Sequence, residues 1–215
     1  MRPNYVLWTG LWVIAVSITL AAHYFPYFPG DVAVDRWVQS LVPRDLGWAQ
    51  GVSRAVDFPW ILLIAALIFA LSWVLAGWRG AVLSIVSLAG MLTLGYWLSP
   101  VVARPRPSLE LVRVFRPLSG YSFPSISALC YAATFGFLAI LAAVKSSGRL
   151  RLALMIGCSV LLVLCWAARI ALGAHWPSDV LISYYLGLLW SACLIRFALR
   201  SDQPLAGGSS SKAGN

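Results

Sequence analysis

Long runs of apolar residues dominate the chain, and short polar segments separate them. A helix needs about 20 apolar residues to cross the hydrocarbon core of a bilayer. Six segments approach or exceed this length, at residues 5–25, 58–77, 81–99, 123–144, 152–172 and 179–199. Because a helix satisfies its backbone polar groups within one segment, the pattern predicts an all-α, polytopic membrane protein with six transmembrane helices.

Residues 26–57 follow another pattern, in which charged side chains alternate with apolar ones. Apolar residues recur there at helical spacing, at Val34, Trp37, Val38 and Leu41. This spacing predicts short amphipathic helices that lie on the membrane surface between the first and second spans. Two roles are open for them: a lid over a site, or an inert interfacial cap.

The two ends of the chain are expected to differ. The segment 5–25 is long for the core of a signal peptide and has no small-residue cleavage site, so we expect a retained span. The last residues, 201–215, include a Gly-Gly-Ser-Ser-Ser run and predict a disordered tail. Residues 1–200 then form one membrane domain.

The composition agrees with a membrane protein and excludes a soluble one. Hydrophobic residues make up 60% of the chain and charged residues 11%, with a mean hydropathy of +0.82. A net charge of +9 would suit a protein that binds nucleic acid, but the basic residues lie between apolar spans. We therefore expect no nucleic acid partner, and assign the charge to topology, lipid headgroups or an anionic substrate.

The distribution of charge predicts an orientation. With a cytoplasmic amino terminus, short inner loops and the tail hold Arg79, Lys145, Arg149, Arg151, Arg200 and Lys212. Six of the seven acidic residues fall on or near the opposite face. The positive-inside rule favours this arrangement. We expect a bacterial inner or plasma membrane, with both termini cytoplasmic.

Unusual polar residues from four segments meet at the outer face of this topology. The third span leads to Arg104-Pro105-Arg106-Pro107, the fourth begins at Pro124-Ser125-Ile126-Ser127, the fifth ends at Arg169, and the sixth begins at His175-Trp176-Pro177-Ser178-Asp179. Helix amino termini carry free N–H groups and partial positive charge, and arginine binds phosphate through two hydrogen bonds. Together these segments predict a phosphate-sized anion site on the extracytoplasmic side.

His175 and Asp179 are four residues apart, so a helical turn would set them on one face. A carboxylate on one imidazole nitrogen fixes the tautomer and frees the other nitrogen to attack. Taken singly, His175 could be structural, Asp179 could complement a helix dipole, and Arg169 could anchor its helix at the interface. Their convergence on one face favours a site. The four cysteines show no metal-binding spacing, so we expect no metal and no cofactor.

These residues resemble the type 2 phosphatidic acid phosphatase superfamily of membrane lipid phosphatases. The family pattern is K-x6-R-P, then P-S-G-H, then S-R-x5-H-x3-D. The third motif matches as Ala168-Arg169, five residues, His175, three residues and Asp179. The second appears as Pro124-Ser125-Ile126-Ser127, and the first as Ser99 followed by Arg106-Pro107. The six-span plan also resembles this family, so the resemblance covers all but the tail.

The resemblance implies a phosphohistidine mechanism that uses no metal. It implies that His175 attacks phosphorus while Asp179 orients it. Phosphate oxygens would be held by Arg106, Arg169, Ser125 and the backbone near Ile126, with Arg104 as a further candidate from the same segment. The partner would be a membrane lipid phosphate or diphosphate.

Two positions depart from the family pattern. Ser99 stands at the family's lysine, and Ser127 stands at its general-acid histidine. General acid catalysis contributes about 10²–10⁴-fold, so an alkoxide leaving group should suffer. A phosphate leaving group has a second pKa of about 6 and needs less help. The hypothesis is therefore a polyprenyl diphosphate substrate, with Tyr121 or a water as a replacement proton donor.

Two other readings of the sequence compete with an enzyme. One is a catalytically inactive relative that binds or transports phospholipids, since loss of the Lys and His positions is what such decay would produce. The other is a structural membrane scaffold, which predicts no clustering of Arg106, Ser125, Arg169 and His175.

Overall fold

The structure is a computed structural model that describes residues 4–198, and no strand occurs among them. Its helices are α1 (Tyr5–Tyr24), α2 (Asp31–Leu41), α3 (Gly47–Arg54), α4 (Trp60–Val102), α5 (Ile126–Tyr131), the π-helical η1 (Ala132–Gly136), α6 (Phe137–Lys145), α7 (Gly148–Ala171) and α8 (Pro177–Ala198). The predicted all-α class is confirmed. The predicted tail at 201–215 lies outside the described residues.

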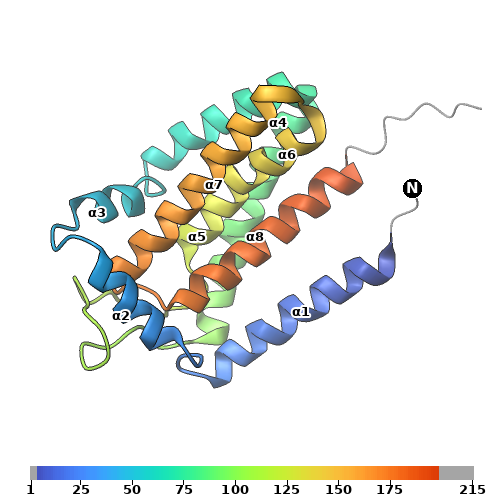
Figure 1. The fold of residues 1–215 in the computed structure, drawn as a ribbon. Helices are drawn as coiled ribbons and strands as arrows, with labels where there is room; N and C mark the ends of the chain where they lie inside the picture. Colours follow the sequence, from blue (N-terminus) through green and yellow to red (C-terminus); the bar gives the residue numbers. More distant parts are fainter. Residues whose placement is uncertain (1–3, 199–215) are drawn as a thin grey trace, which may run out of the picture.

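Five helices in the described part of the chain are long and apolar enough to cross a membrane. They are α1, α4, the continuous helix Ile126–Lys145, α7 and α8. In Figure 1 these helices run along one bundle, and α2 and α3 lie across one end of it. The most apolar window of Ile126–Lys145 is 67% buried, against 11% for those of α1, α4 and α7. The helix Ile126–Lys145 is therefore the centre of the bundle, and the others present apolar side chains outward.

The 43-residue α4 covers both the second and the third predicted spans. Its helical conformation is interrupted at Ala76 and Gly77, where Gly77 has a φ of +66° that favours glycine. Both ends of α4 lie at the same end of the bundle. Asp57, just before α4, shares a cavity with Arg169, and Arg104, just after it, contacts Asp179. The chain therefore reverses at this interruption (Figure 1).

The interfacial segment does form the predicted short helices, α2 and α3. The buried face of α2 differs from the predicted apolar face, because it holds Asp31, Asp35, Val38 and Gln39. Trp37 is 59% exposed and Leu41 is 65% exposed. The reason is that Asp31 and Gln39, on the protein-facing side of α2, supply polar partners to the end of the bundle. Trp37 and Leu41 face outward, where a membrane surface would cover them.

A long loop, residues 103–125, crosses this end of the bundle and is fixed at its middle. The N–H of Phe115 donates to the carbonyl of Leu172 at 3.0 Å. The side-chain amide of Gln39 donates to the carbonyl of Arg113 at 2.8 Å and to that of Ile170 at 3.1 Å. The loop is thus held between α2 and the end of α7.

Gly173 permits this close crossing. Its φ is +60°, and a Cβ built there would lie 2.1 Å from the carbonyl oxygen of Arg113. We expect Gly173→Ala to destabilise the protein by at least about 1–3 kcal/mol, because it adds a left-handed strain to a steric clash. Thermal unfolding in detergent measures this effect. Gly157→Ala is the matched control, since a Cβ at Gly157 meets nothing within 4 Å, and an unchanged midpoint for Gly173→Ala would contradict the argument.

Candidate active site

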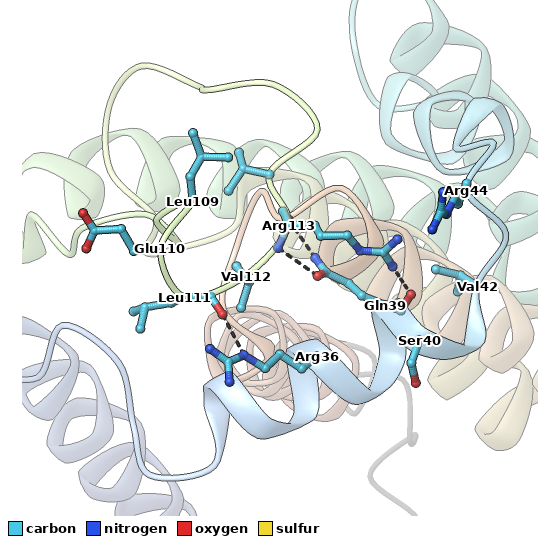
Figure 2. Close-up of a pocket in the computed structure, with 11 residues that line it drawn as sticks. Arg36, Gln39, Ser40, Val42, Arg44, Leu109, Glu110, Leu111, Val112 and Arg113 are labelled. Atoms are coloured by element: carbon cyan, nitrogen blue, oxygen red, sulfur yellow. Dashed lines mark hydrogen bonds between the residues drawn. The ribbon is translucent and has the colours of Figure 1, made fainter.

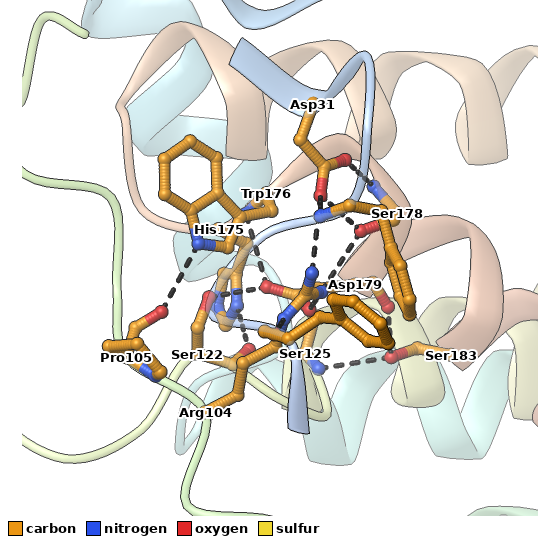
Figure 3. A network of polar contacts seen from close by, with 12 residues as sticks. Asp31, Arg104, Pro105, Ser122, Ser125, His175, Trp176, Ser178, Asp179 and Ser183 are labelled. Atoms are coloured by element: carbon orange, nitrogen blue, oxygen red, sulfur yellow. Dashed lines mark hydrogen bonds and ion pairs between the residues drawn. The ribbon is translucent and has the colours of Figure 1, made fainter. Parts of the chain in front are cut away.

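Arg104 lies at the centre of a buried polar network (Figure 3). Its guanidinium forms ion pairs with Asp31, at 3.2 Å, and with Asp179. It also donates to the carbonyl of Phe25 at 3.0 Å and to the hydroxyl of Ser178 at 3.0 Å. The side chain is 0% exposed and lines none of the cavities described below. Its predicted role in phosphate binding therefore does not fit this geometry, because protein acceptors already engage every nitrogen of its guanidinium.

Asp179 faces this network rather than the histidine. Its carboxylate accepts hydrogen bonds from Arg104, from the hydroxyl of Ser122 and from the N–H of Trp176, the last at 3.1 Å. Within residues 4–198, no hydrogen bond joins Asp179 to His175. The predicted direct contact is wrong because α8 begins at Pro177, so His175 precedes the helix and the four-residue spacing does not put the two side chains on one face.

His175 is oriented by a backbone carbonyl instead. Its Nδ1 lies 2.5 Å from the carbonyl oxygen of Ser122. A carbonyl can only accept, so Nδ1 carries the proton and donates it. Burial, followed by the positive charges of Arg169 and Arg106, holds the pKa of His175 well below its usual range. The imidazole is therefore neutral near pH 7, and the unprotonated Nε2 accepts one long hydrogen bond, from Nη1 of Arg106.

Arg106 and Arg169 converge on the histidine, as predicted. Nη1 of Arg106 lies 3.4 Å from Nε2 of His175 and donates to the carbonyl of Ala174 at 2.7 Å. Arg169 is 8% exposed and donates to the hydroxyl of Ser53 on α3. The Nε atom of each arginine is buried and has no hydrogen-bond partner. Burial and the nearby Arg169 lower the pKa of Arg106 to about 10, against an opposing effect of Asp179.

This arrangement is a cationic site in which, within residues 4–198, neither Arg106 nor Arg169 forms an ion pair. The buried guanidinium of Arg169 and the half-buried one of Arg106 lie near one neutral imidazole, and each retains an unpartnered Nε donor. Unpartnered buried donors are costly. An anion with several acceptor oxygens would satisfy both donors and offset the repulsion between the two charges.

The predicted serine positions lie around this site in different roles. Ser125 caps α5: its hydroxyl accepts from the N–H of Ala128 at 3.4 Å, and its N–H donates to Ser183 at 3.0 Å. Ser127 lines a cavity together with Arg169. Ser99 lies in the last turn of α4 and lines none of the described cavities. Pro124 precedes the cap rather than occupying the first helical position, whereas Pro177 does begin α8.

Ile126 does not crowd the site. A Cβ built on Gly95 of α4 would lie 2.5 Å from the Cδ1 of Ile126. The side chain of Ile126 therefore packs against α4, in the space that Gly95 leaves open. Only its backbone remains as a candidate for phosphate binding.

Two adjoining cavities open beside His175. The first, called here the Arg169 cavity, has a volume of about 260 Å³ and is lined by Gln50, Ser53, Arg54, Asp57, Phe115, Arg116, Leu118, Ser127, Arg169, Leu172 and Ala174. The second, the Arg106 cavity, has about 220 Å³ and shares Arg116, Leu118 and Ala174 with the first. His175 is 3% exposed and lines neither. The residue before it, Ala174, lines both.

A larger hollow of about 810 Å³ lies between α2 and the loop 109–114 (Figure 2). It holds no predicted site residue. Two of its arginines are engaged by backbone carbonyls: Arg36 donates to Leu111 at 2.8 Å, and Arg113 donates to Gln39. These contacts hold the loop on α2, which is a structural role.

Several residues of this site were not identified from the sequence. Ser122 orients His175 through its carbonyl, Asp31 pairs with Arg104, and Ser53 holds Arg169. Asp31 could have been suspected from the sequence, because a charged segment between two spans needs polar partners. Ser122 could not have been identified from the sequence, since it acts through a backbone carbonyl, which every residue type has. Tyr121, a predicted proton donor, is 43% exposed and lines neither cavity.

The ion pairs of Arg104 generate a stability prediction. Arg104→Met leaves Asp31 and Asp179 buried without their cation, and loss of one partner of a buried pair costs about 3–5 kcal/mol. We expect a large fall in the thermal midpoint in detergent or a failure to fold. Arg36→Met is the control, because Arg36 is exposed and donates to one carbonyl. Equal midpoints for the two variants would contradict the central role of Arg104.

Comparisons with known proteins identify the family and the fold of this chain. No curated protein sequence matches the chain significantly. A crystal structure described as the first transmembrane PAP2 type phosphatidylglycerolphosphate phosphatase from Bacillus subtilis matches with a TM-score of 0.71 at 19% identity, over 92% of this chain and 98% of that one. The profile of the PAP2 superfamily, the type 2 phosphatidic acid phosphatases, matches residues 80–202. The chain therefore belongs to the PAP2 superfamily and has the fold of its membrane phosphatases.

Proposed function

We propose that this protein is an integral membrane phosphatase or phosphotransferase that cleaves a lipid diphosphate through a phosphohistidine on His175. The observation that carries the proposal is the pair of buried, unpartnered Nε donors on Arg106 and Arg169 beside a neutral histidine. A tetrahedral phosphoryl group has the charge and the acceptors that these donors lack. In this proposal, the serines at the lysine and histidine positions of the first two motifs, Ser99 and Ser127, restrict the range of substrates but do not abolish activity.

The chemistry begins at Nε2 of His175. Its lone pair attacks the terminal phosphorus and forms a P–N bond, while the bond from that phosphorus to the bridging oxygen breaks. The electron pair leaves with the lipid monophosphate. The proton on Nδ1 stays, donated to the carbonyl of Ser122. Water then attacks phosphorus, the P–N bond breaks, and inorganic phosphate leaves with the proton balance made up by solvent.

The phosphoryl oxygens are held by Arg106 and Arg169 in this proposal. The N–H groups of Ile126 and Ser127 belong to the first turn of α5 and have no acceptor within residues 4–198, so they are available to the same oxygens. Asp179 acts indirectly, by holding Ser122 and Arg104 in position. It is a positioning residue rather than a proton carrier.

A diphosphate fits the missing general acid better than a phosphate monoester does. Ser127 stands where the family has a histidine, and a serine hydroxyl is a poor acid near neutrality. An alkoxide leaving group requires a proton, whereas a lipid monophosphate leaves as a stable anion, its second pKa being about 6. The apolar outer surface of the bundle suits a polyprenyl chain that remains in the bilayer.

The first experiment measures phosphate release by purified protein from a polyprenyl diphosphate and from phosphatidic acid. We expect release from the diphosphate to exceed release from phosphatidic acid by at least about tenfold, from the share of catalysis that the acid supplies. His175→Ala should abolish both.

The controls separate the competing readings. His23→Ala removes the other histidine, at the far end of α1 from the amino terminus, and should retain activity. Release that persists in His175→Ala would overturn the phosphohistidine. Phospholipid binding without release in the unmodified protein would favour the inactive lipid-binding relative.

The protonation state of His175 generates a pH prediction. Because its pKa is lowered, the neutral nucleophile persists below pH 6.5, and the acid limb of kcat/KM due to His175 should fall below that value. Arg106→Gln removes one of the charges that lower this pKa, so the limb should move to higher pH, in addition to about a 10- to 100-fold loss of activity. Arg36→Gln should leave the limb in place. A limb that stays fixed or moves to lower pH in Arg106→Gln would sink the assignment.

We also propose six membrane crossings, with α4 counted as two, and the site on the extracytoplasmic face. The test uses single cysteines in a variant whose four native cysteines are replaced by alanine. A membrane-impermeant maleimide applied to intact cells should label Tyr121→Cys, and should label Trp78→Cys and Ser147→Cys only after permeabilisation. Failure to label Trp78→Cys from either side would mean that α4 crosses once.

A further inference from the structure

Arg54 and Arg116 line the Arg169 cavity and have no role in the chemistry described so far. Both side chains are exposed. Within residues 4–198, neither guanidinium forms a hydrogen bond or an ion pair. Two unpaired cations therefore face the same cavity as the buried Arg169.

Helix α3 fixes the position of Arg54. Gln50, Ser53 and Arg54 lie at helical spacing on one face of α3, and all three line the cavity. Arg169 donates to the hydroxyl of Ser53. The buried Ala49 packs α3 against the end of α7. Arg54 therefore directly follows Ser53, the residue whose hydroxyl accepts a hydrogen bond from Arg169.

The loop over the bundle end fixes Arg116 in a similar way. The residue before it, Phe115, donates its N–H to the carbonyl of Leu172 at 3.0 Å. Arg116 lines both the Arg169 cavity and the Arg106 cavity. It therefore lies where the cavity of Arg169 and the cavity of Arg106 adjoin.

We propose that Arg54 and Arg116 form a second phosphate subsite, which holds the lipid-side phosphate of a diphosphate while Arg106 and Arg169 hold the terminal one. This inference rests on the proposed function for its substrate, and deepens it. A single phosphate carries a charge of about −1.5 to −2 at pH 7, which Arg106 and Arg169 already match. The two outer arginines are then an excess that a second phosphate would use.

The subsite also explains how cleavage proceeds without a histidine at position 127. When the bridging bond breaks, its electron pair stays on the lipid-side phosphate, which gains one negative charge. Arg54 and Arg116 would stabilise that charge as it develops, which is the electrostatic counterpart of donating a proton. Asp57 is the one carboxylate among the residues that line this cavity, and it offsets only part of the positive charge.

Other arginines at this end of the bundle supply a contrast. Arg104 is fully paired, and Arg36 and Arg113 donate to backbone carbonyls. Arg44 is exposed, has no partner within residues 4–198 and lines the separate hollow of Figure 2. Arg44 is therefore the matched control for Arg54 and Arg116.

The binding experiment uses inorganic diphosphate and inorganic phosphate as probes, measured by calorimetry on the full-length protein in detergent. We expect diphosphate to bind more tightly than phosphate. The double variant Arg54→Gln/Arg116→Gln should weaken diphosphate binding about 10- to 100-fold, as expected for lost charge-assisted hydrogen bonds, and leave phosphate binding within about twofold. Arg44→Gln should change neither. Equal weakening for both probes, or no weakening for diphosphate, would overturn the subsite.

The activity experiment separates this inference from the proposed function. With a polyprenyl diphosphate, the double variant should lose kcat as well as raise KM, because the leaving phosphate loses stabilisation in the transition state. With phosphatidic acid, any activity should be unchanged. Absence of His175-dependent release from unmodified protein would refute the proposed function alone, since the calorimetric result stands independently. A double variant with unaltered diphosphate turnover would refute the subsite alone.

Discussion

The buried guanidinium of Arg104 is the interaction on which the rest of the site depends. Removing such a cation from water costs several kcal/mol unless its partners are well placed. Here the partners are Asp31, in the first turn of α2, and Asp179, in the first turn of α8. Asp31 also accepts from the N–H of Ser178 at 2.9 Å. One cation therefore fixes the starts of two helices, and Ser122 and His175 take their positions from Asp179.

The electrostatics of the site follow from burial. A histidine near two cations and out of water stays neutral, which is the state that a nucleophile needs. The same burial prevents water from satisfying the Nε atoms of Arg106 and Arg169. Under the proposed mechanism these donors are in place before the phosphate binds, so that little reorganisation is needed during the reaction.

The sequence predicts most of the fold, because the bilayer requires long apolar helices and such runs are easy to find. The main difference is α4, where Ala76 and Gly77 interrupt the helix without ending it. Motif spacing also identifies His175, Arg106 and Arg169, which the structure brings together. The predicted contact between His175 and Asp179 is absent, because His175 lies before the start of α8 and helical periodicity does not extend to it. The predicted phosphate-binding role of Arg104 does not fit the geometry either. Arg104 and Arg106 have the same local sequence pattern, and only tertiary contacts decide which partners each one meets.

The span of the Arg104 contacts has a consequence for biogenesis. Asp31 and Arg104 are 73 residues apart, and Arg104 meets Ser178 and Asp179 only 74 and 75 residues later. During synthesis, Asp31 and Arg104 are made long before α8, so their network is incomplete until the last helix inserts. A chain that stops short of α8 leaves Arg104 facing a single carboxylate. In incomplete chains Nη1 of Arg104 then has no acceptor, because both of its partners, Ser178 and Asp179, belong to α8. An unsatisfied guanidinium nitrogen at the membrane surface is a feature by which proteases that survey the membrane can distinguish incomplete chains from finished protein.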